Sequence, residues 1–596
     1  MSRRNGVALA LLISLVSCAR SEPAVTIPEP DFPEKRSSSA IAITSDGSTV
    51  LVVNPDSNSL SLLETADMEV LDEIEVGLDP RTVSVDVVGK VVVTANRGSA
   101  SISVIDLEKR ELVADVSVGA LPWGVVLSQD GGQAYVACEA SDWIAIVDLE
   151  RQEVTDRIRV ESRPNGLALS RDGNTLYATH LLTARVSVID LSSGTVEGMI
   201  PTWVDGNLSQ SIVLHPQHGK AYLPLTRSNT TNMRLSFDTT VFPLVTVLDL
   251  EAGEMLHKEI LSLPEADQPV GLPYDAAFLP DGSKLYVANA ASNDVSVIDM
   301  RTGLRAAHIT VEDNPRGLVV SPDGQWVYVN NTLAGSVSVI DTDQDRVTAV
   351  IKVTQIPLPP ILLHGKRVFH ASRDPDLSKQ SWMSCNTCHW EGEHDGRTWT
   401  FSFSGPRNTT SLLGMINTYP LRWSAEWDEA ADSEFAITEE QFGEGLLGGE
   451  MHPTLGEPNA GRSYDLDSLA LFIDSLAFLP NLQGEEFDQG LLALGQRLFF
   501  DERTGCAECH PPPYYTDFEV HDVGTAQGPA EVLGPLIDTP TLLSLSRSAP
   551  YLHDGSAASL MDVLKSGNPD DQHGATSQLS DDQLDALIAF MLALDL

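Results

Sequence analysis

The tetrapeptide Ser103-Val104-Ile105-Asp106 returns in closely related forms along the N-terminal part of the chain. The acidic residue that ends each form is Glu64, Asp106, Asp148, Asp190, Asp249, Asp299 or Asp341. Successive members lie 42, 42, 42, 59, 50 and 42 residues apart, so the chain contains seven units. A period of this length is typical of folds in which each repeat is one small supersecondary unit.

Within a unit, short alternating runs of apolar and polar residues are separated by turn signals. The last unit has the turn Ser321-Pro322-Asp323-Gly324, a strand-like run from Trp326 to Asn330, a third run ending at Asp341 and a fourth ending near Val353. Four short strands per unit are typical of a β-propeller blade. A β-solenoid would have shorter repeats, and the Gly-His and Trp-Asp marks of WD40 blades are missing. We therefore predict an all-β, seven-bladed propeller over residues 39–353.

Two stretches further on have the form C-x-x-C-H, namely Cys385 to His389 and Cys506 to His510. Two thiols at this spacing can form thioethers to the two vinyl groups of one haem, and the histidine then lies beneath the iron. A redox dithiol needs no following histidine, and a structural zinc site usually has a second cysteine pair close by. The sequence therefore predicts two covalently bound haem c groups, with Cys385, Cys388, Cys506 and Cys509 as attachment sites and His389 and His510 as proximal ligands.

Composition changes after the propeller. Pro357, Pro359 and Pro360 break the strand pattern, and helical periodicity follows, as in residues 469–479 and 491–500. The last segment opens with Ser580-x-x-Gln583, a capping box, before an apolar helical face. We predict two mainly α-helical cytochrome c-like lobes, residues 354–484 for the first haem and 485–596 for the second.

Several motifs in this sequence resemble known families. Tyr286-Val287-Ala288-Asn289 and Tyr328-Val329-Asn330-Asn331 resemble the signature of YVTN-type propellers. Residues 363–369 (LHGKRVF) and 494–500 (LGQRLFF) look like the repeated helix that precedes each haem in bacterial dihaem cytochrome c peroxidases. Residues 539–555, followed by Ser559-Leu560, are similar to the C-terminal segment of that family, which MauG-type enzymes share.

The resemblance implies a division of labour between the two haems. In the family, the N-terminal haem reacts with hydrogen peroxide and the C-terminal haem feeds it electrons, with calcium between the lobes. The donor implied is a small redox protein or a quinol-linked carrier. Trp399, Trp423 and Trp427 are candidate electron relays; the competing and favoured interpretation is that each is a core or interface residue.

The catalytic acid/base is less well marked. The family pattern Trp-Asp-Gly-Arg reads Trp423-Ser424-Ala425-Glu426 in this chain. Peroxide reduction needs a group that moves a proton onto the leaving oxygen. We expect Glu434 to do so, with Glu426 as the alternative, and an exposed carboxylate without a catalytic role is the competing interpretation.

The sixth iron ligands also depart from the family. Where peroxidases have methionine and MauG-type enzymes have tyrosine, this chain has Ser566 and Gly567. The next capable side chain is His573, so we hypothesise bis-histidine ligation of the second haem. Met451 is a candidate distal group for the first haem.

The N-terminus has the features of an export signal. Arg3 and Arg4 precede a mainly apolar run of ten residues, 7–16, shorter than the roughly 20 that span a bilayer. The ending at Cys18 resembles a bacterial lipobox, which predicts a signal over residues 1–17, lipidation of Cys18 and a proline-rich tether over residues 18–38; a plain signal peptide is the alternative. We expect an exported protein, periplasmic or anchored at the outer membrane, which contacts membrane only through its lipid.

The chain is strongly acidic, with 38 basic and 84 acidic residues and a formal charge of -46. Such a surface repels nucleic acid and attracts basic partners.

Blades five and six contain insertions of 17 and 8 residues, including residues 227–243. We expect these insertions to form loops that dock the haem lobes or a ligand; the alternative is that they are tolerated surface loops.

Two classes of function fit these observations. One is a peroxidase-like or MauG-like dihaem enzyme, and the other is a non-enzymatic electron carrier whose propeller binds a partner. A relative of haem d1 nitrite reductase would need a third haem in the propeller. The histidines in the propeller of this chain, for example His180, His215 and His308, occupy no common position in the repeat, so we do not expect them to ligate such a haem.

Overall fold

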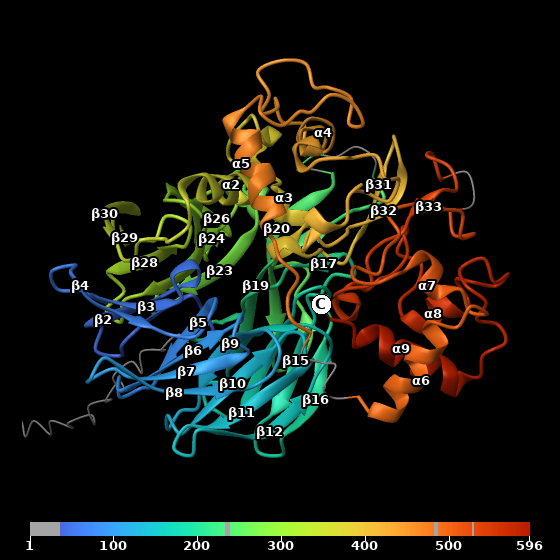
Figure 1. Cartoon of the computed structure of the whole chain (residues 1–596). Coiled ribbons are helices and arrows are strands. Elements are labelled where there is room, and N and C mark those ends of the chain that lie inside the picture. Colours follow the sequence, from blue (N-terminus) through green and yellow to red (C-terminus); the bar gives the residue numbers. More distant parts are fainter. Residues whose placement is uncertain (1–35, 233–235, 237–238, 482–486, 527–529, 596) are drawn as a thin grey trace, which may run out of the picture.

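The computed structural model describes residues 36–595 except 233–235, 237–238, 482–486 and 527–529. The predicted signal peptide, Cys18 and most of the tether therefore lie outside the described residues. Seven sheets arranged around one axis form the blue-to-green half of the molecule, and the segments from α2 to α9 cover one face and one side of it (Figure 1). The predicted seven-bladed propeller is confirmed.

Each blade takes its strands from one sequence repeat. Blade one contains β1 (Ile41–Ile43), β2 (Thr49–Asn54), β3 (Ser59–Glu64) and β4 (Val70–Glu75), and blade two contains β5 (Pro80–Val85), β6 (Val91–Asn96), β7 (Ser101–Asp106) and β8 (Glu111–Ser117). Blade three contains β9 (Pro122–Leu127), β10 (Gln133–Cys138), β11 (Trp143–Asp148) and β12 (Glu153–Arg159). Blade four contains β13 (Pro164–Leu169), β14 (Thr175–His180), β15 (Val186–Asp190) and β16 (Thr195–Ile200). Blade five contains β17 (Gly206–Asn207), β18 (Val213–Leu214), β19 (Lys220–Ser228), β20 (Val241–Asp249), β21 (Glu254–Met255) and β22 (Leu261–Ser262). Blade six contains β23 (Pro273–Phe278), β24 (Lys284–Asn289), β25 (Asp294–Asp299) and β26 (Leu304–Thr310). Blade seven contains β27 (Pro315–Val320), β28 (Trp326–Asn331), β29 (Ser336–Asp341) and β30 (Arg346–Lys352). Short helices η1 (Pro55–Ser57) and α1 (Leu263–Ala266) interrupt the strands.

The repeated residues have identifiable structural roles. Asp106 ends the third strand of its blade and accepts a hydrogen bond from the backbone N–H of Lys109, and Asp299 does the same for Arg301, so this aspartate closes the tight turn into the fourth strand. Asn289, the last residue of a YVTN-like motif, donates to Asp294 and Ser296 on the next strand. The repeats therefore encode turn chemistry as well as strands.

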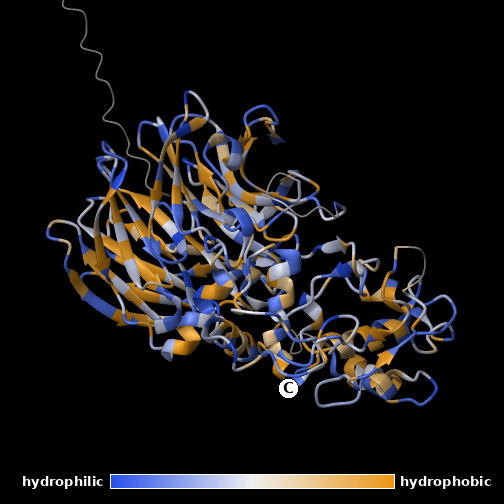
Figure 2. Cartoon of the chain, turned by 90° about the horizontal axis from the view of Figure 1, so that it is seen from above, coloured by the Kyte–Doolittle hydropathy of each residue, from blue (hydrophilic) through white to orange (hydrophobic). Residues whose placement is uncertain are grey.

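Apolar residues fill the space between neighbouring blades, and Figure 2 shows hydrophobic positions concentrated along the strands. Blade one and blade seven share no strand, so the ring closes through side chains. Ile41 and Val50 of blade one pack with Tyr328 and Val339 of blade seven. Asn330 adds two hydrogen bonds, from Nδ2 to the carbonyl oxygens of Ala40 (3.1 Å) and Val53 (3.2 Å).

Residues 36–39 lie in the central channel. The N–H of Leu169 donates to the carbonyl of Arg36, and the N–H of Val83 donates to that of Ser39, so the segment touches the innermost strands of blades four and two. Ser39 Oγ also donates to Asp275 of blade six at 2.6 Å. The last residues of the predicted tether therefore pack inside the propeller.

The region after the propeller contains two similar helical units. The first comprises α2 (Pro360–His370), η2 (Lys379–Ser381), α3 (Cys385–Cys388), η3 (Trp390–Gly392), β31 (Thr398–Phe401), β32 (Gly405–Asn408), η4 (Met415–Asn417), η5 (Ala430–Asp432), α4 (Ser433–Phe435), the π-helical turn η6 (Ala436–Glu440) and α5 (Tyr464–Asp474). The second comprises α6 (Gln489–Phe499), α7 (Cys506–Cys509), β33 (Val520–His521), β34 (Ile537–Asp538), η8 (Leu545–Arg547), α8 (Leu560–Leu564) and α9 (Asp581–Leu592).

Each unit is built on one crossing of two helices. α2 crosses α5 at Gly365, where a Cβ atom would lie 1.9 Å from the carbonyl oxygen of Ser468, and α6 crosses α9 at Gly495, where it would lie 1.9 Å from that of Ala586. Glycine is required at both positions because the backbones approach so closely. The capping box predicted at Ser580 is present at the start of α9.

We predict that Gly365→Ala destabilises the first helical unit by about 1–3 kcal/mol, because the added methyl group must push α2 and α5 apart. The measurement is thermal unfolding followed by the helical circular dichroism signal. Gly448→Ala is the matched control, since nothing lies within 4 Å of the position that its Cβ would take. Equal melting temperatures for the two variants would contradict the prediction.

Candidate functional site

The first C-x-x-C-H stretch forms the single-turn helix α3, which begins after a capping box between Ser384 and Thr387. His389 Nδ1 lies 2.9 Å from the carbonyl oxygen of Thr410. A hydrogen bond of this kind places the proton on Nδ1 and leaves the lone pair on Nε2 for a metal. Burial lowers the pKa of His389 to about 4 and raises that of the Cys385 thiol to about 11, so the imidazole is neutral at pH 7.

The second stretch repeats this geometry. α7 holds Cys506 and Cys509, and His510 Nδ1 lies 2.9 Å from the carbonyl oxygen of Tyr515. Burial lowers the pKa of His510 to about 4, so this ring too is neutral. The four cysteines of the two stretches form no disulfide. Both stretches therefore present two thiols and one oriented imidazole nitrogen, the set of groups that covalent haem attachment requires.

His573 lies across from His510. The two ring centroids are 6.4 Å apart and the ring planes are inclined by 43°. Two imidazoles bound to opposite sides of one metal ion, each about 2 Å from it, would have centroids separated by roughly 6 Å. The loop that carries His573 is held by Asn568, whose Oδ1 accepts from the His573 N–H and whose Nδ2 donates to the Gly574 carbonyl.

The two candidate acid/base residues differ in their surroundings. Glu434 is 2% exposed, and its carboxylate accepts hydrogen bonds from the backbone N–H groups of Leu446 (2.9 Å) and Leu447 (3.0 Å). It stands on α4, directly before the π-helical turn η6, and such turns are frequent at functional sites. Glu426 is half-buried and forms an ion pair with Arg422. Glu434 is therefore buried and fixed, while Glu426 shares the cation Arg422 with Glu440, which lies closer to it at 2.7 Å.

The other candidates also belong to the first unit. Met451 is partly buried and packs on the apolar cluster that also includes Cys385. Trp399 is 3% exposed, contacts the cluster of Cys388 and donates from Nε1 to Asp395. Trp423 donates from its ring nitrogen to the carbonyl of Asn408. Trp427 lies beneath the guanidinium of Arg422, which it binds by a cation–π contact.

Two features lie beside the second C-x-x-C-H stretch: a cluster of three possible metal ligands and a carboxyl group whose pKa is raised by burial. Cys509, Asp517 and His521 have potential ligand atoms within 4.8 Å of one another, and Asp517 accepts from His521 at 2.8 Å. Burial, with the nearby charge of Asp517, raises the pKa of Asp538 to about 8. If Cys509 binds haem covalently, its sulfur is no longer a free thiolate for a separate metal ion.

The sequence reasoning missed the contact between the first C-x-x-C-H stretch and the propeller. Residues 390–394, directly after His389, lie in the mouth of the central channel, and Glu391 and Glu393 form ion pairs with propeller arginines. The sequence did contain a signal for these arginines. Arg81 and Arg316 occupy the same position of the repeat, directly after the proline that starts the innermost strand of their blades, so they could have been expected on the same face of the propeller. The insertion in blade five also contributes, because the N–H of Thr400 donates to the carbonyl of Thr230 and Val241 packs against Trp399.

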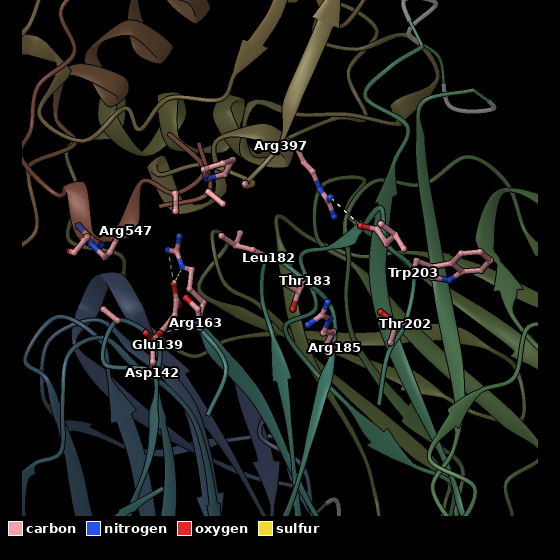
Figure 3. A pocket seen from close by; sticks show the side chains of 18 of the residues that line it. Glu139, Asp142, Arg163, Leu182, Thr183, Arg185, Thr202, Trp203, Arg397 and Arg547 are labelled. Atoms are coloured by element: carbon pink, nitrogen blue, oxygen red, sulfur yellow. Dashed lines mark hydrogen bonds and ion pairs between the residues drawn. The ribbon is translucent and has the colours of Figure 1, made fainter. Parts of the chain in front are cut away.

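A cavity of about 440 Å³ opens beside this contact, where the propeller and both helical units meet (Figure 3). Its lining includes Glu139, Arg163 and Arg185 of the propeller, Arg397 of the first unit and Arg547 of the second. Glu139 and Arg163 form an ion pair at 2.7 Å. The cavity is therefore polar and rich in guanidinium groups.

The fold and the paired histidine stretches define a class of protein, a seven-bladed propeller joined to a two-unit helical region with two C-x-x-C-H sites. Residues 16–113 match the family model described as "Lactonase, 7-bladed beta-propeller". Among the described residues, none of the helices combines the length and apolar character needed to cross a bilayer.

Three curated proteins are similar to part of the chain. The hydrazine synthase subunit gamma of Kuenenia stuttgartiensis is 27% identical over 270 residues, which cover 37% of this chain and 74% of that protein. The methylamine utilization protein MauG of Methylorubrum extorquens is 28% identical over 236 residues (34% of this chain, 66% of that protein), and MauG of Methylophilus methylotrophus is 27% identical over 239 residues (34% and 70%). A solved structure of hydrazine synthase from K. stuttgartiensis aligns with a TM-score of 0.48 at 24% identity, over 54% of this chain and 98% of that chain. The protein thus combines a seven-bladed propeller with similarity to MauG.

The raised pKa of Asp538 predicts a specific pH dependence. An unfolded aspartate ionises near pH 4, whereas Asp538 in the fold keeps its proton up to about pH 8. Its contribution to stability is therefore complete below about pH 4 and is lost as the pH rises through about 8. We expect Asp538→Asn to melt at a higher temperature than the unchanged protein at pH 8.5, with the difference shrinking toward pH 4. A difference that does not change with pH would contradict this.

Proposed function

We propose that this protein is an exported dihaem c-type cytochrome with a redox function, most simply the reduction of hydrogen peroxide or a MauG-like oxidation. The observation that carries the proposal is the duplicated site, in which each C-x-x-C-H turn presents two thiols and a histidine whose Nδ1 is held by a carbonyl. Similarity to MauG and to hydrazine synthase subunit gamma supports a haem-related role.

Under this proposal Cys385 and Cys388 hold one haem and Cys506 and Cys509 the other, with His389 and His510 as proximal ligands. Haem iron, when bound, supplies the redox centre at which peroxide is reduced and the store for electrons in transit. The reaction consumes two electrons and two protons and converts one hydrogen peroxide into two water molecules. The chain must therefore provide a proton donor beside the first haem and a route for electrons from the second.

Glu434 is our proposed proton donor. Its burial keeps water away from the carboxylate, and the N–H groups of Leu446 and Leu447 fix the position of both oxygens. A proton held on one of these oxygens could pass to the departing oxygen of peroxide. Trp423, which donates to the backbone of Asn408, remains our proposed relay between the haems.

The second candidate function is electron transfer without catalysis. It requires both irons to be closed, and the 6.4 Å spacing of the His510 and His573 rings would place a nitrogen ligand on each side of the second iron. If this function is correct, Met451 would be the sixth ligand of the first iron, and the propeller would serve as a scaffold that binds a partner.

We also propose calcium between the two units. Asn408 belongs to the first unit, its Nδ2 lies 2.5 Å from the carbonyl oxygen of Pro550 in the second, and its Oδ1 is buried without a partner in the described part of the chain. A buried amide oxygen without a hydrogen-bond donor suits a hard cation, which takes oxygen ligands. Asn408 Oδ1 would then be one ligand of the ion, while Asn408 Nδ2 keeps its hydrogen bond to Pro550 of the second unit.

The proposed location of the protein and its proposed electron donor follow from its N-terminal sequence and its net charge. A signal ending at Cys18 would export the chain and attach it to a membrane through lipid alone. The formal charge of -46 would attract a small basic redox protein as electron donor, although a quinol-linked carrier is also compatible with the family. Hydrogen peroxide is the proposed substrate.

Haem attachment can be tested one site at a time. We expect the protein to contain two haems by mass spectrometry and by the pyridine haemochrome assay, because each C-x-x-C-H turn offers a complete set of groups. Cys385→Ser with Cys388→Ser should leave one haem, and Cys506→Ser with Cys509→Ser should leave the other. Cys138→Ser, in the propeller core, is the control and should keep both. A protein without covalent haem would overturn the proposal.

Electron paramagnetic resonance, before and after mixing with peroxide, separates the two candidate functions. An enzyme should show a high-spin ferric signal in the oxidised or half-reduced protein, and peroxide should remove this signal rapidly. Glu434→Gln should slow that reaction by roughly 100-fold or more, as expected for loss of a general acid. Two low-spin signals in both redox states, unchanged by peroxide, would leave the electron carrier as the function.

The ligation of the second haem has its own test. His573→Ala should convert one low-spin ferric signal into a high-spin one, because the ring opposite His510 is removed. The variant His452→Ala, which removes a ring bonded to the carbonyls of Glu457 and Pro458, serves as control. An unchanged spectrum in His573→Ala would show that this ring is not the sixth ligand.

A further inference from the structure

The mouth of the central channel carries a set of large side chains at equivalent positions of the repeat. Each follows the proline that starts the innermost strand of its blade, and the set comprises Arg81, Trp123, Tyr274 and Arg316. The guanidinium of Arg81 lies 4.7 Å from the ring centre of Trp123, and that of Arg316 lies 5.4 Å from that of Tyr274. These four residues, which we call the mouth clamp, all surround the same segment of the first helical unit.

Trp390 is the apolar half of that segment. It follows His389 directly, is 1% exposed, and its ring lies between Trp123 (centroids 6.0 Å apart) and Tyr274 (5.8 Å). Aromatic rings at these separations attract one another beyond the gain from burial. The residue after the proximal histidine is therefore held by two blades of the propeller.

Glu391 is the charged half. Its carboxylate pairs with Arg81 (2.7 Å) and Arg316 (2.7 Å), and its N–H donates to Asn386 Oδ1 (2.9 Å), inside the first C-x-x-C turn. Its backbone has a φ of 52°, a left-handed conformation that a residue with a side chain rarely adopts. Such strain persists only where the surroundings enforce it. The clamp is thus connected to the haem-attachment turn by one hydrogen bond.

Glu393 joins three parts of the molecule. It pairs with Arg97 (2.7 Å) and Arg163 (2.8 Å) of the propeller and with Arg547 (3.0 Å) of the second helical unit. Arg163 and Arg547 both line the cavity of Figure 3. A carboxylate four residues beyond His389 therefore links the second unit to the propeller and to the first unit, in addition to direct contacts between the units such as the Arg407–Glu531 ion pair.

Stability alone does not account for this arrangement. Taking several charges out of water is costly, and replacing a buried ion pair by apolar residues is often neutral or stabilising. A buried network does, however, specify one geometry, because a displaced partner leaves an unpaired charge. The ion pairs of Glu391 and Glu393 are therefore better explained by positioning than by stabilisation.

We propose that the propeller positions the haem site: the mouth clamp holds Trp390 and Glu391 and so orients His389, and Glu393 sets the placement of the second haem unit relative to the first. Glu391 and Glu393 are positioning residues in this scheme, and the inference rests on the proposed dihaem function. The central mouth, where a propeller commonly binds a ligand, is occupied by the protein's own redox region.

The test compares Glu391→Gln and Glu393→Gln, which keep shape and remove charge, in the full-length holoprotein. We expect Glu391→Gln to shift the midpoint potential and resonance signal of the first haem alone, identified from the Cys506→Ser, Cys509→Ser variant. Glu393→Gln should slow electron transfer between the haems. Glu161→Gln is the control, since within the described part of the chain the ion-pair partner of Glu161 is the exposed Arg185 alone.

The outcomes distinguish this inference from the function on which it rests. A protein without covalent haem overturns the proposed function, whereas two haems with unchanged potentials and transfer rate in both variants overturn the clamp alone. Should Glu391→Gln fail to fold, Arg316→Lys serves instead, since lysine keeps the charge but loses the planar group over Tyr274. It should shift the midpoint potential of the first haem, and no shift overturns the clamp.

Discussion

The carboxylate of Glu393 is a point at which three parts of the molecule are joined, since guanidinium groups from two parts of the propeller and from the second helical unit converge on it. Burial alone would raise the pKa of Glu393, but Arg547, Arg163 and Arg97 lower it to about 2, so the group is ionised throughout the physiological range. Each partner must stay in place, because a withdrawn guanidinium leaves charge unpaired in a buried site.

The two helical units are variations on one design with different surroundings. Gly365 and Gly495 allow the same close helix crossing, and His389 and His510 donate to carbonyls in the same way. The first unit lies on the propeller, while the second has His573 opposite its proximal histidine. An identical local framework can thus hold two groups of different reactivity, because ligation and electric field depend on what packs around it.

Much of the fold could be predicted from sequence because its signals are local. In blades two to seven the aspartate that ends the third strand closes a turn through its own neighbours, and the capping box at Ser580 involves residues three apart. The first and second C-x-x-C-H turns are equally local. The entry of residues 36–39 into the channel could not be predicted, since their partners on β13 and β5 lie far along the chain and carry no matching pattern.

By itself, the sequence determined the number of blades, the strands within them, the two C-x-x-C-H turns and the helices around those turns, all through contacts between residues close in the chain. Only the tertiary structure decided that Trp390 and Glu391 fill the propeller mouth, that Glu393 joins three parts, that Glu434 is buried on two amides and that His573 faces His510. The physical reason is that such contacts join residues tens to hundreds of positions apart. Their partners are chosen by how whole units pack, which no short stretch encodes.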